Sequence, residues 1–254
     1  MELWTQQHTI SLLPSVAAMV LLSLLLHIWL GKKSFRIRMI PIQIIAVILV
    51  LLEVGKQTIS LIRGYDLYNL PFHFCSLFIF ALPAMAFYRG KHKERVCIVT
   101  TALCAAVFSL MLIYPNLIYS AWAVEHYFED FMAFHTVTFH NLVMLAFLLI
   151  AALNLSEPAK GDAKAIFVFV AVFCVVSASM AHILKTNYAN FYTCNIPVLE
   201  TVRLAVQDAV GAIPAKLLYI SILSVLNLVY VYGAYWLYRL VRKLFVRTKI
   251  TASV

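Results

Sequence analysis

Long apolar runs separated by short polar connections make up most of the chain. Each run is close to the roughly 20 residues that an α-helix needs to cross the hydrocarbon core of a bilayer. The pattern predicts an all-α, polytopic membrane helical bundle with about seven transmembrane helices, over residues 10–30, 40–62, 70–88, 96–114, 131–153, 165–184 and 216–238. Because no Pro- or Ser-rich linker separates these runs, we expect residues 1–254 to form a single transmembrane domain.

Composition places the chain in the same class. Hydrophobic residues make up 63% of it, charged residues only 12%, and the mean hydropathy is +0.90, which excludes an ordinary soluble domain. The first run has no basic segment before it and no small-residue cleavage site after it, so it is interpreted as a retained span and not as a signal peptide. A multi-pass protein of a cell membrane is therefore expected.

Basic residues cluster after the first, third, fifth and seventh apolar runs. The positive-inside rule assigns these connections to the cytoplasm, which predicts an N-terminus outside and a C-terminus in the cytoplasm. The net charge of +9 comes from these short clusters, so nucleic acid is not an expected partner and membrane lipids are. These patterns leave the oligomeric state open.

The stretch NLPFHFCS, residues 69–76, begins the third run. Pro71 suits the first turn of a helix and Asn69 is a candidate cap before it. This places His73 in the first turn, where the positive end of the helix dipole favours a neutral imidazole. On a regular helix Cys75 points about 200° away from His73, so each side chain needs partners from other helices.

Polar residues of four runs reach the same outer half of the membrane in this topology. His73 enters the third run from outside, His135 and His140 enter the fifth run from outside, and His182 leaves the sixth run toward outside. Glu53 and Lys56 lie near the outer end of the second run, one turn apart, as expected for a structural ion pair. Because ionisable side chains at membrane depth usually face the bundle interior or a wet cavity, we expect one outward-facing polar chamber.

The fifth run places Thr136 and His140 four residues apart, on one face of a helix. His135 points about 140° away from His140 and is expected to serve another surface. A zinc site made by His73, His140 and His182 is an alternative, but no acidic residue accompanies them at helical spacing. No cofactor or metal is therefore expected.

Cysteine spacing shows neither a CxxC motif nor a repeat, so it predicts neither a disulfide framework nor a zinc module. The simplest interpretation of Cys75 is a small apolar filler, and that of His182 is a histidine bonded to a nearby carbonyl. The five cysteines are Cys75, Cys97, Cys104, Cys174 and Cys194.

Four short segments, in order and spacing, resemble the YwaF-like bacterial integral membrane proteins from about residue 40 to residue 238. They are LPFHFC, FHNLVML, TNYANF beginning at Thr186, and VGAIPAKLLY. That family is distantly similar to eukaryotic membrane enzymes of lipid acyl chemistry: a cysteine-dependent phospholipid acyltransferase, and fatty-acid-ester hydrolases that use a threonine and a histidine. The resemblance implies a lipid-facing catalytic pocket in a bacterial plasma membrane, with His140 and His73 at the positions of the family's histidines.

One position departs from the acyltransferase pattern. Phe72 stands where the reactive cysteine of that enzyme falls, immediately before the histidine of the third run. The candidate nucleophiles are therefore Cys75, Thr136, Ser76 or a water molecule. A thiolate is the strongest of these chemically, but it needs a nearby base.

The leading hypothesis is an integral membrane enzyme that carries out acyl transfer or ester hydrolysis on a lipid. His140 would act as general base, Cys75 or Thr136 as nucleophile, and His73 would orient the substrate or donate to the oxyanion. Among the neighbouring polar residues, substrate binding is assigned to Asn187, His182, Glu53 and Lys56.

The alternative hypothesis is a binding or transport protein for a small polar or anionic solute, with Asn187, Lys185 and Arg203 at its outer entrance. A third is a scaffold whose polar groups only bond one another. The absence of an internal inverted repeat argues against a transporter of the common secondary type.

Overall fold

The structure is a computed structural model that describes residues 3–159 and 161–251, and the elements within those residues are helical. Four short 3-10 turns, η1 (Leu67–Asn69), η2 (Cys75–Leu77), η3 (Pro115–Leu117) and η4 (Tyr188–Asn190), interrupt the connections. In chain order the α-helices are α1 (Gln6–Leu30), α2 (Phe35–Ile62), α3 (Phe78–Phe87), α4 (Lys93–Ile113), α5 (Ala121–Glu125), α6 (Phe131–Ala152), α7 (Asp162–Ile183), α8 (Pro197–Val210) and α9 (Ala212–Thr251).

Six of the described helices, α1, α2, α4, α6, α7 and α9, are long and apolar enough to cross a membrane. This confirms the predicted class, a helical membrane bundle, with a count close to the expected seven. The third apolar run is the exception, because it is helical only over Cys75–Phe87. A helix of that length rises about 20 Å, against about 30 Å of hydrocarbon, so it does not cross the bilayer alone.

Residues 70–74 are irregular, so the prediction of a helix starting near Pro71 with Asn69 as its cap is wrong. Asn69 ends η1 instead, and the carboxylate of Asp66 caps that turn. The side chain of Asn69 donates to Ser60 Oγ at 2.8 Å, which holds the connection against α2. His73 therefore lies before the helix, in a connection shaped by tertiary contacts, and not in a first helical turn.

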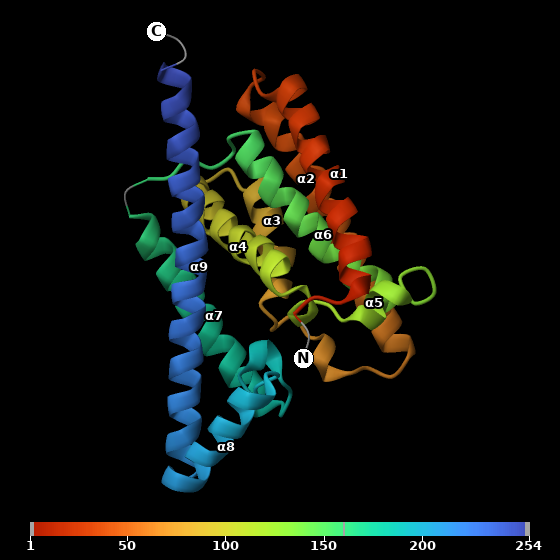
Figure 1. Cartoon of the computed structure of the whole chain (residues 1–254), viewed down its shortest axis with the longest axis vertical. Coiled ribbons are helices and arrows are strands. Elements are labelled where there is room, and N and C mark those ends of the chain that lie inside the picture. The colour runs from red at the N-terminus through yellow and green to blue at the C-terminus, as the bar shows by residue number, and fades with distance from the viewer. Residues whose placement is uncertain (1–2, 160, 252–254) are drawn as a thin grey trace.

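The core is built around α4, which contacts α3, α6, α7 and α9. Residues 97–107 of α4 are buried without interruption, and a helix that is buried all round belongs at the centre of a bundle. On one side of it, α2 packs against both α3 and α6 (Figure 1). These contacts bring the C-terminal end of α2 close to the beginning of α6 and to the connection that leads into the short third helix.

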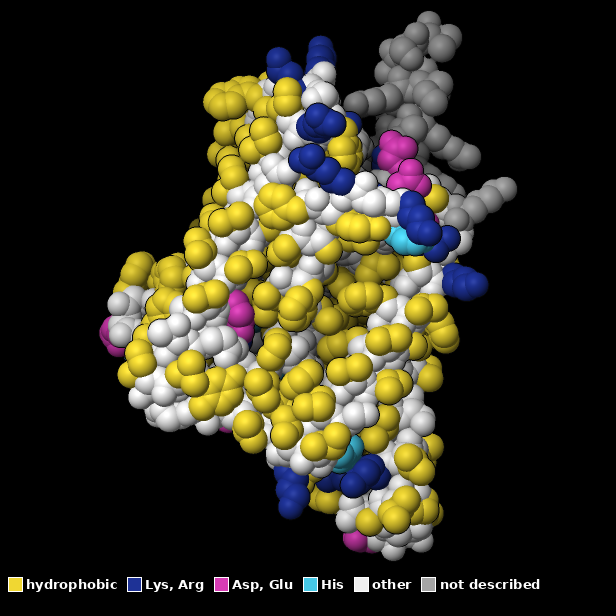
Figure 2. Space-filling view, turned by 180° about the vertical axis from the view of Figure 1, so that it is seen from behind, with side chains coloured by type: hydrophobic (Ala, Val, Ile, Leu, Met, Phe, Trp, Pro, Cys, Tyr) yellow, Lys and Arg dark blue, Asp and Glu magenta, His cyan; other side chains and the backbone are white. Residues whose placement is uncertain are grey.

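The outer surface of the bundle is apolar. Large exposed hydrophobic side chains follow α1, α2, α7 and α9, and Figure 2 shows such side chains across the middle of the molecule. Lys and Arg gather toward one end in that view, where the turn between α1 and α2 also lies in Figure 1. A bilayer is the solvent that suits this surface, and the cytoplasmic assignment of the basic end stays a prediction.

The connection between α7 and α9 contains an amphipathic helix that the apolar pattern did not predict. α8 begins at Pro197, which suits the first helical position, and it packs against α9. Its outward face exposes Val198, Leu199 and Val202. A helix with an unburied apolar face beside spanning helices has the character of one that lies in a membrane interface.

Asp130 fixes the start of α6 and gives a pH-dependent prediction. Its Oδ1 accepts from the backbone N–H of Met132 at 2.7 Å, and its Oδ2 lies 2.8 Å from Arg63 Nη1. The hydrogen bond from Arg63 holds the pKa of Asp130 below its ordinary value of 3.8. A depressed carboxylate pKa contributes stability above the unfolded pKa, and that contribution is lost as the pH falls through the folded pKa.

Asp130→Ala is therefore expected to lower the free energy of unfolding by about 1 kcal/mol at neutral pH, a value reduced for solvent screening of the ion pair. The difference from wild type should shrink as the pH falls below 3.8. Thermal unfolding of wild type and variant, at neutral pH and at a pH below 3.8, measures this difference. Asp130→Asn is the control, since it retains a capping oxygen and loses only the charge; equal losses at neutral and acid pH would contradict the argument.

Candidate functional site

The candidate site is centred on Lys56, near the C-terminal end of α2. Lys56 Nζ lies 2.8 Å from Glu53 Oε1, one turn earlier, and the two side chains are only 12% and 11% exposed. This confirms the predicted ion pair. Opposite charges buried to this degree depend on each other, because removal of one leaves the other without compensation.

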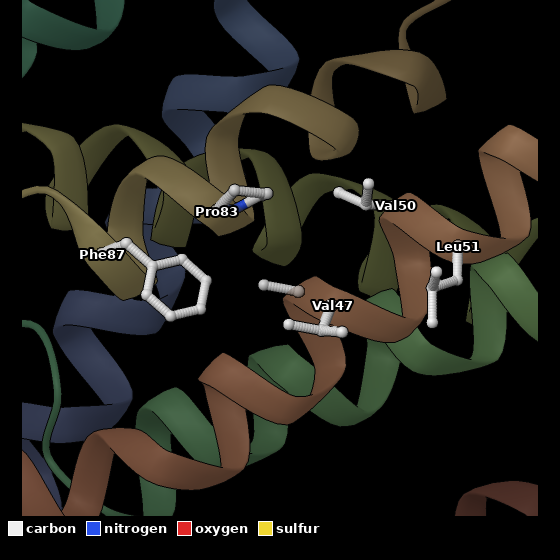
Figure 3. Close-up of a pocket in the computed structure, with 6 residues that line it drawn as sticks. Val47, Val50, Leu51, Pro83 and Phe87 are labelled. Carbon is white, nitrogen blue, oxygen red and sulfur yellow. The ribbon is translucent and has the colours of Figure 1, made fainter.

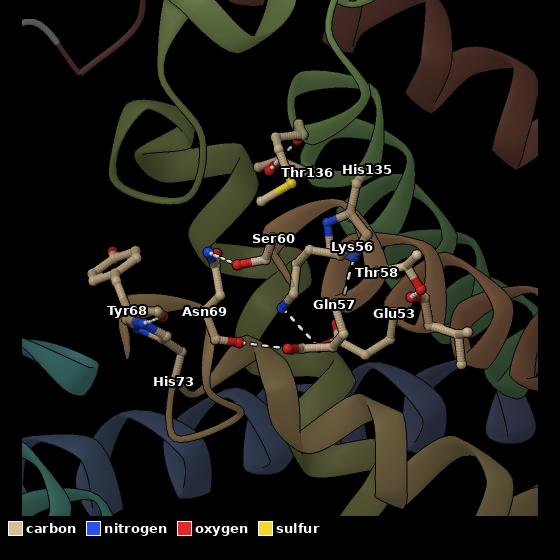
Figure 4. A network of polar contacts seen from close by, with 12 residues as sticks. Glu53, Lys56, Gln57, Thr58, Ser60, Tyr68, Asn69, His73, His135 and Thr136 are labelled. Carbon is tan, nitrogen blue, oxygen red and sulfur yellow. Dashed lines mark hydrogen bonds and ion pairs between the residues drawn. The ribbon is translucent and has the colours of Figure 1, made fainter. Parts of the chain in front are cut away.

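Glu53 is also tied to neighbouring segments. Gln57 Nε2 donates to Glu53 Oε1 at 2.7 Å and to the carbonyl of Asn69 at 2.8 Å, and Tyr65 Oη donates to Gln57 Oε1 at 2.6 Å. From α6, His135 Nε2 lies 3.5 Å from Glu53 Oε2. Figure 4 shows this network between α2, α6 and the connection that follows α2.

Three members of this network add to the sequence-based account. His135 is expected on a different face of its helix from His140, and the structure places it toward Glu53 of α2, whereas His140 meets the carbonyl of Thr136. Gln57 and Tyr65 were missed. Gln57 could have been found from its spacing, because it lies four residues after Glu53 on the same helix. Tyr65 could not, because its contact with Gln57 depends on the path of the connection after α2.

Lys56 brings three of the predicted catalytic residues into one electrostatic field. Its charge acts on His73 in the connection, on Cys75 at the start of η2 and on His140 of α6. These residues are far apart in the sequence and belong to three different segments. The arrangement therefore has the composition that the sequence suggested for the chamber: a thiol, two imidazoles and an ion pair.

His140 is buried and its tautomer follows from its hydrogen bond. Its Nδ1 lies 2.7 Å from the carbonyl oxygen of Thr136. A carbonyl only accepts, so Nδ1 carries the hydrogen and Nε2 is the basic nitrogen. His140 thus has the form required of a general base that works through Nε2.

Thr136 is placed differently from the expected hydroxyl–imidazole pair. Its Oγ1 donates back to the carbonyl of Met132 at 2.8 Å, the usual local bond of a threonine within a helix. His140 meets the carbonyl of Thr136 and not its hydroxyl. Proximity on one helical face is present, but the two side chains do not form a catalytic hydrogen bond in this geometry.

His73 is held by the connection in which it lies. Its Nε2 lies 3.0 Å from the carbonyl of Tyr68, and its ring packs 4.3 Å from the Tyr68 ring and 5.3 Å from the Tyr188 ring. Burial lowers the pKa of His73 and the charge of Lys56 lowers it further, so the imidazole is neutral at neutral pH. Its single N–H is then engaged with Tyr68, and it has no hydrogen left to donate to an oxyanion.

Cys75 differs from the other cysteines in its surroundings. All five thiols are free; Cys75 is half-buried and lies within the field of Lys56, whereas Cys97, Cys104 and Cys174 are buried within spanning helices. Burial raises the pKa of the Cys75 thiol above its ordinary value of 9.0, and the charge of Lys56 opposes only part of that rise, so the thiol keeps its proton until a base removes it. Cys75 is the candidate nucleophile that the geometry favours over Thr136, because the Thr136 hydroxyl is engaged by the carbonyl of Met132.

Two of the residues predicted to bind substrate serve the connection before α8 instead. Asn187 Oδ1 accepts from the backbone N–H groups of Tyr192 and Thr193 at 3.2 and 3.1 Å, and its Nδ2 donates to Asn195 at 3.1 Å. His182 packs with its ring 5.5 Å from that of Tyr192. These contacts place both residues with the α7–α8 connection, so their assignment to the chamber has no support here.

Metal binding is not indicated by the described part of the chain, where no group of three or more His, Cys, Asp or Glu residues is placed to hold an ion. The zinc alternative required His73, His140 and His182 to converge. His73 and His140 share the field of Lys56, whereas His182 lies among the charges of Lys216 and Arg203.

Two apolar hollows open on the surface of the bundle. One, of about 160 Å³, lies between α2 and α3 and is shown in Figure 3; its lining residues are Ala46, Val47, Val50, Leu51, Pro83 and Phe87. The other, of about 560 Å³, lies between α7 and α9 and has Lys164 at its rim. Only the first is formed by α2, the helix that carries Glu53 and Lys56.

Comparison with known proteins gives one match. The model of a family described as the TMEM164 family matches residues 3–239, nearly the whole chain. No curated protein and no solved structure matches. The relationship to YwaF-like proteins rests on the four short segments alone.

Proposed function

This chain belongs to the TMEM164 family, and from the site around Lys56 we propose that it is a membrane enzyme of lipid acyl chemistry, acting by acyl transfer or ester hydrolysis. One observation carries the proposal: a buried ammonium, Lys56, acts on a thiol, Cys75, and on an imidazole, His140. Ionisable groups at this depth are costly and usually have a functional partner. Esters that reach such a site from the bilayer are lipid esters.

The first half-reaction begins at Cys75. His140 Nε2 takes the thiol proton, and the thiolate attacks the carbonyl carbon of the lipid ester. A C–S bond forms and the C–O bond to the leaving alcohol breaks. The proton on His140 passes to the departing oxygen, which leaves a thioester on Cys75 and a lysolipid.

The second half-reaction restores the enzyme. A water molecule or the hydroxyl of an acceptor lipid gives its proton to His140 and attacks the thioester carbonyl. A new C–O bond forms, the C–S bond breaks, and the Cys75 thiolate recovers the proton from His140. Water as acceptor gives hydrolysis, and an alcohol gives acyl transfer.

Lys56 supplies the electrostatic stabilisation in both halves. Its ammonium favours the thiolate first and then the oxyanion of each tetrahedral intermediate. Glu53, with Gln57 and His135 behind it, holds the ammonium in position. His73, whose N–H is engaged by Tyr68, acts as a positioning residue for the connection that leads into Cys75.

Replacement of the general base tests the proposal. We expect purified wild type in liposomes to convert phosphatidylcholine to lysophosphatidylcholine or to a new ester, and His140→Gln to lower the rate about 10²- to 10⁴-fold. His126→Gln is the matched control, since His126 caps the C-terminus of α5 and is partly exposed. Absence of turnover by wild type, or an unchanged rate in a folded His140→Gln variant, would overturn the proposal.

The alternative function, binding or transport of an anionic solute, draws less support. Asn187 bonds Tyr192, Thr193 and Asn195 within the connection before α8. Arg203 is paired with Glu200, with Nη2 2.6 Å from Oε1 and Nε 2.8 Å from Oε2. Two of the three groups expected at a solute entrance, Asn187 and Arg203, are therefore engaged by the protein itself, and Lys185 is exposed. Location in the plasma membrane and an N-terminus outside stay predictions.

A further inference from the structure

The hollow between α2 and α3 is an open groove with an entirely apolar lining. It has a volume of about 160 Å³ and is bordered by α2 residues 46–51 and by Pro83 and Phe87 of α3. Leu51 is 64% exposed and Phe87 49% exposed, so the groove opens outward from the bundle (Figure 3). In a bilayer that direction faces lipid chains, and nothing in the lining offers a hydrogen bond to a polar ligand.

The third apolar segment connects this groove to the candidate nucleophile. Cys75, Ile79, Pro83 and Phe87 follow one another at four-residue intervals. Within α3, residues spaced in this way form a ridge along one side of the helix. Cys75 begins the 3-10 turn η2 that leads directly into α3, so it precedes the first residue of this ridge by about one turn.

Helix α2 forms the opposite wall of the groove and links it to the Glu53–Lys56 ion pair. Ala46, Val50 and Glu53 recur at intervals of four and three residues and so lie on one face of the helix. Near the N-terminus of α2, Gln43 Nε2 lies 3.5 Å from the carbonyl of Ala86, at the end of α3, and near the C-terminus of α2, Ser60 is bonded by Asn69, which precedes α3. The two helices therefore run in opposite directions. The groove therefore lies beside the charged pair at one end and stops near Phe87 at the other.

We propose that the α2–α3 groove holds the distal part of the substrate's fatty acyl chain when the ester carbonyl lies at Cys75. The inference rests on the proposed function and names the substrate class as a long-chain acyl ester. A chain can enter sideways without leaving the hydrocarbon, and the two rows of residues lead from the thiol to the groove. The α7–α9 hollow is larger but has no such link to Cys75.

Chain-length selectivity tests the groove. Val47→Trp fills it, so the preference for long-chain over short-chain phosphatidylcholine in proteoliposomes should fall about tenfold or more. Phe87→Ala lengthens it and should shift the preference toward longer chains. Val175→Trp, on the exposed side of α7, and Phe80→Ala, on α3 outside the groove, are the controls and should leave the preference unchanged.

The outcomes separate the two proposals. If wild type turns over no lipid, the proposed function fails and the groove assignment fails with it. If lipid is turned over but turnover does not depend on Cys75, the nucleophile assignment fails, and the groove assignment fails with it because it is measured from Cys75. If turnover depends on Cys75 but Val47→Trp and Phe87→Ala keep the wild-type preference, only the groove assignment is overturned. If the groove holds only bulk lipid and not the substrate chain, the groove variants keep the wild-type chain-length preference in this way.

Discussion

Cys75→Ala is expected to reduce lipid turnover by about 10⁴-fold or more, down to the level left by binding and electrostatic stabilisation alone. The thiol is the bond-forming group in the proposed reaction, and removal of a nucleophile abolishes every later step. Lysolipid release from phosphatidylcholine liposomes measures the effect. Thermal unfolding of the same preparation checks that the variant is folded, because Cys75 is only half-buried and its loss should cost little stability.

Cys97→Ala is the matched control, since it removes a thiol from α4, away from the proposed nucleophile. It should retain the wild-type rate. A folded Cys75→Ala variant that keeps full activity would exclude Cys75 as nucleophile. If Thr136→Val were inactive in that case, the nucleophile would be the threonine, even though its hydroxyl donates to Met132 in this structure.

Lys56→Met is expected to destabilise the protein strongly, by about 3–5 kcal/mol. The variant leaves the buried Glu53 carboxylate without its closest counter-charge, which lies 2.8 Å away in the native protein. The remaining partners, Gln57 and His135, do not replace a permanent positive charge. Chemical or thermal unfolding in detergent measures the loss, and Lys164→Met, at an exposed lysine, should have little effect.

The double variant Lys56→Met, Glu53→Gln separates stability from chemistry. It removes both charges, so it should recover most of the lost stability. It should remain inactive, because the thiolate and the oxyanion have lost the ammonium that stabilises them. A double variant that is stable and also active would show that the ion pair is structural only.

The sequence was sufficient to predict the spanning helices but not the third apolar segment. Apolar runs of membrane length identify spans directly, and six of them became long helices. The run from residue 70 is just as apolar, yet its first residues are irregular. Two distant contacts hold them, the bond from Asn69 to Ser60 and that from Ser177 Oγ to the carbonyl of Phe72 at 2.8 Å. Local periodicity carries no information about such contacts.

The sequence was sufficient to predict which polar residues form the site, but not which partners they contact. Charged and polar residues inside apolar runs stand out in a sequence, which is why Glu53, Lys56, Cys75 and His140 were predicted. The direction of His135 was judged relative to His140, whereas the crossing of α6 and α2 decides its partner. Asn187 was assigned to substrate binding, but its side chain bonds Tyr192, Thr193 and Asn195 within its own connection.

Detection of an acyl-enzyme tests the central claim most directly. Wild-type protein incubated with phosphatidylcholine liposomes should gain the mass of one acyl chain, and peptide mapping should place it on Cys75 in a thioester that hydroxylamine removes. The adduct should accumulate further in His140→Gln if deacylation slows more than acylation, and it should be absent in Cys75→Ala. Turnover of lipid with no adduct on Cys75 under any of these conditions, or an adduct on another residue, would contradict the account.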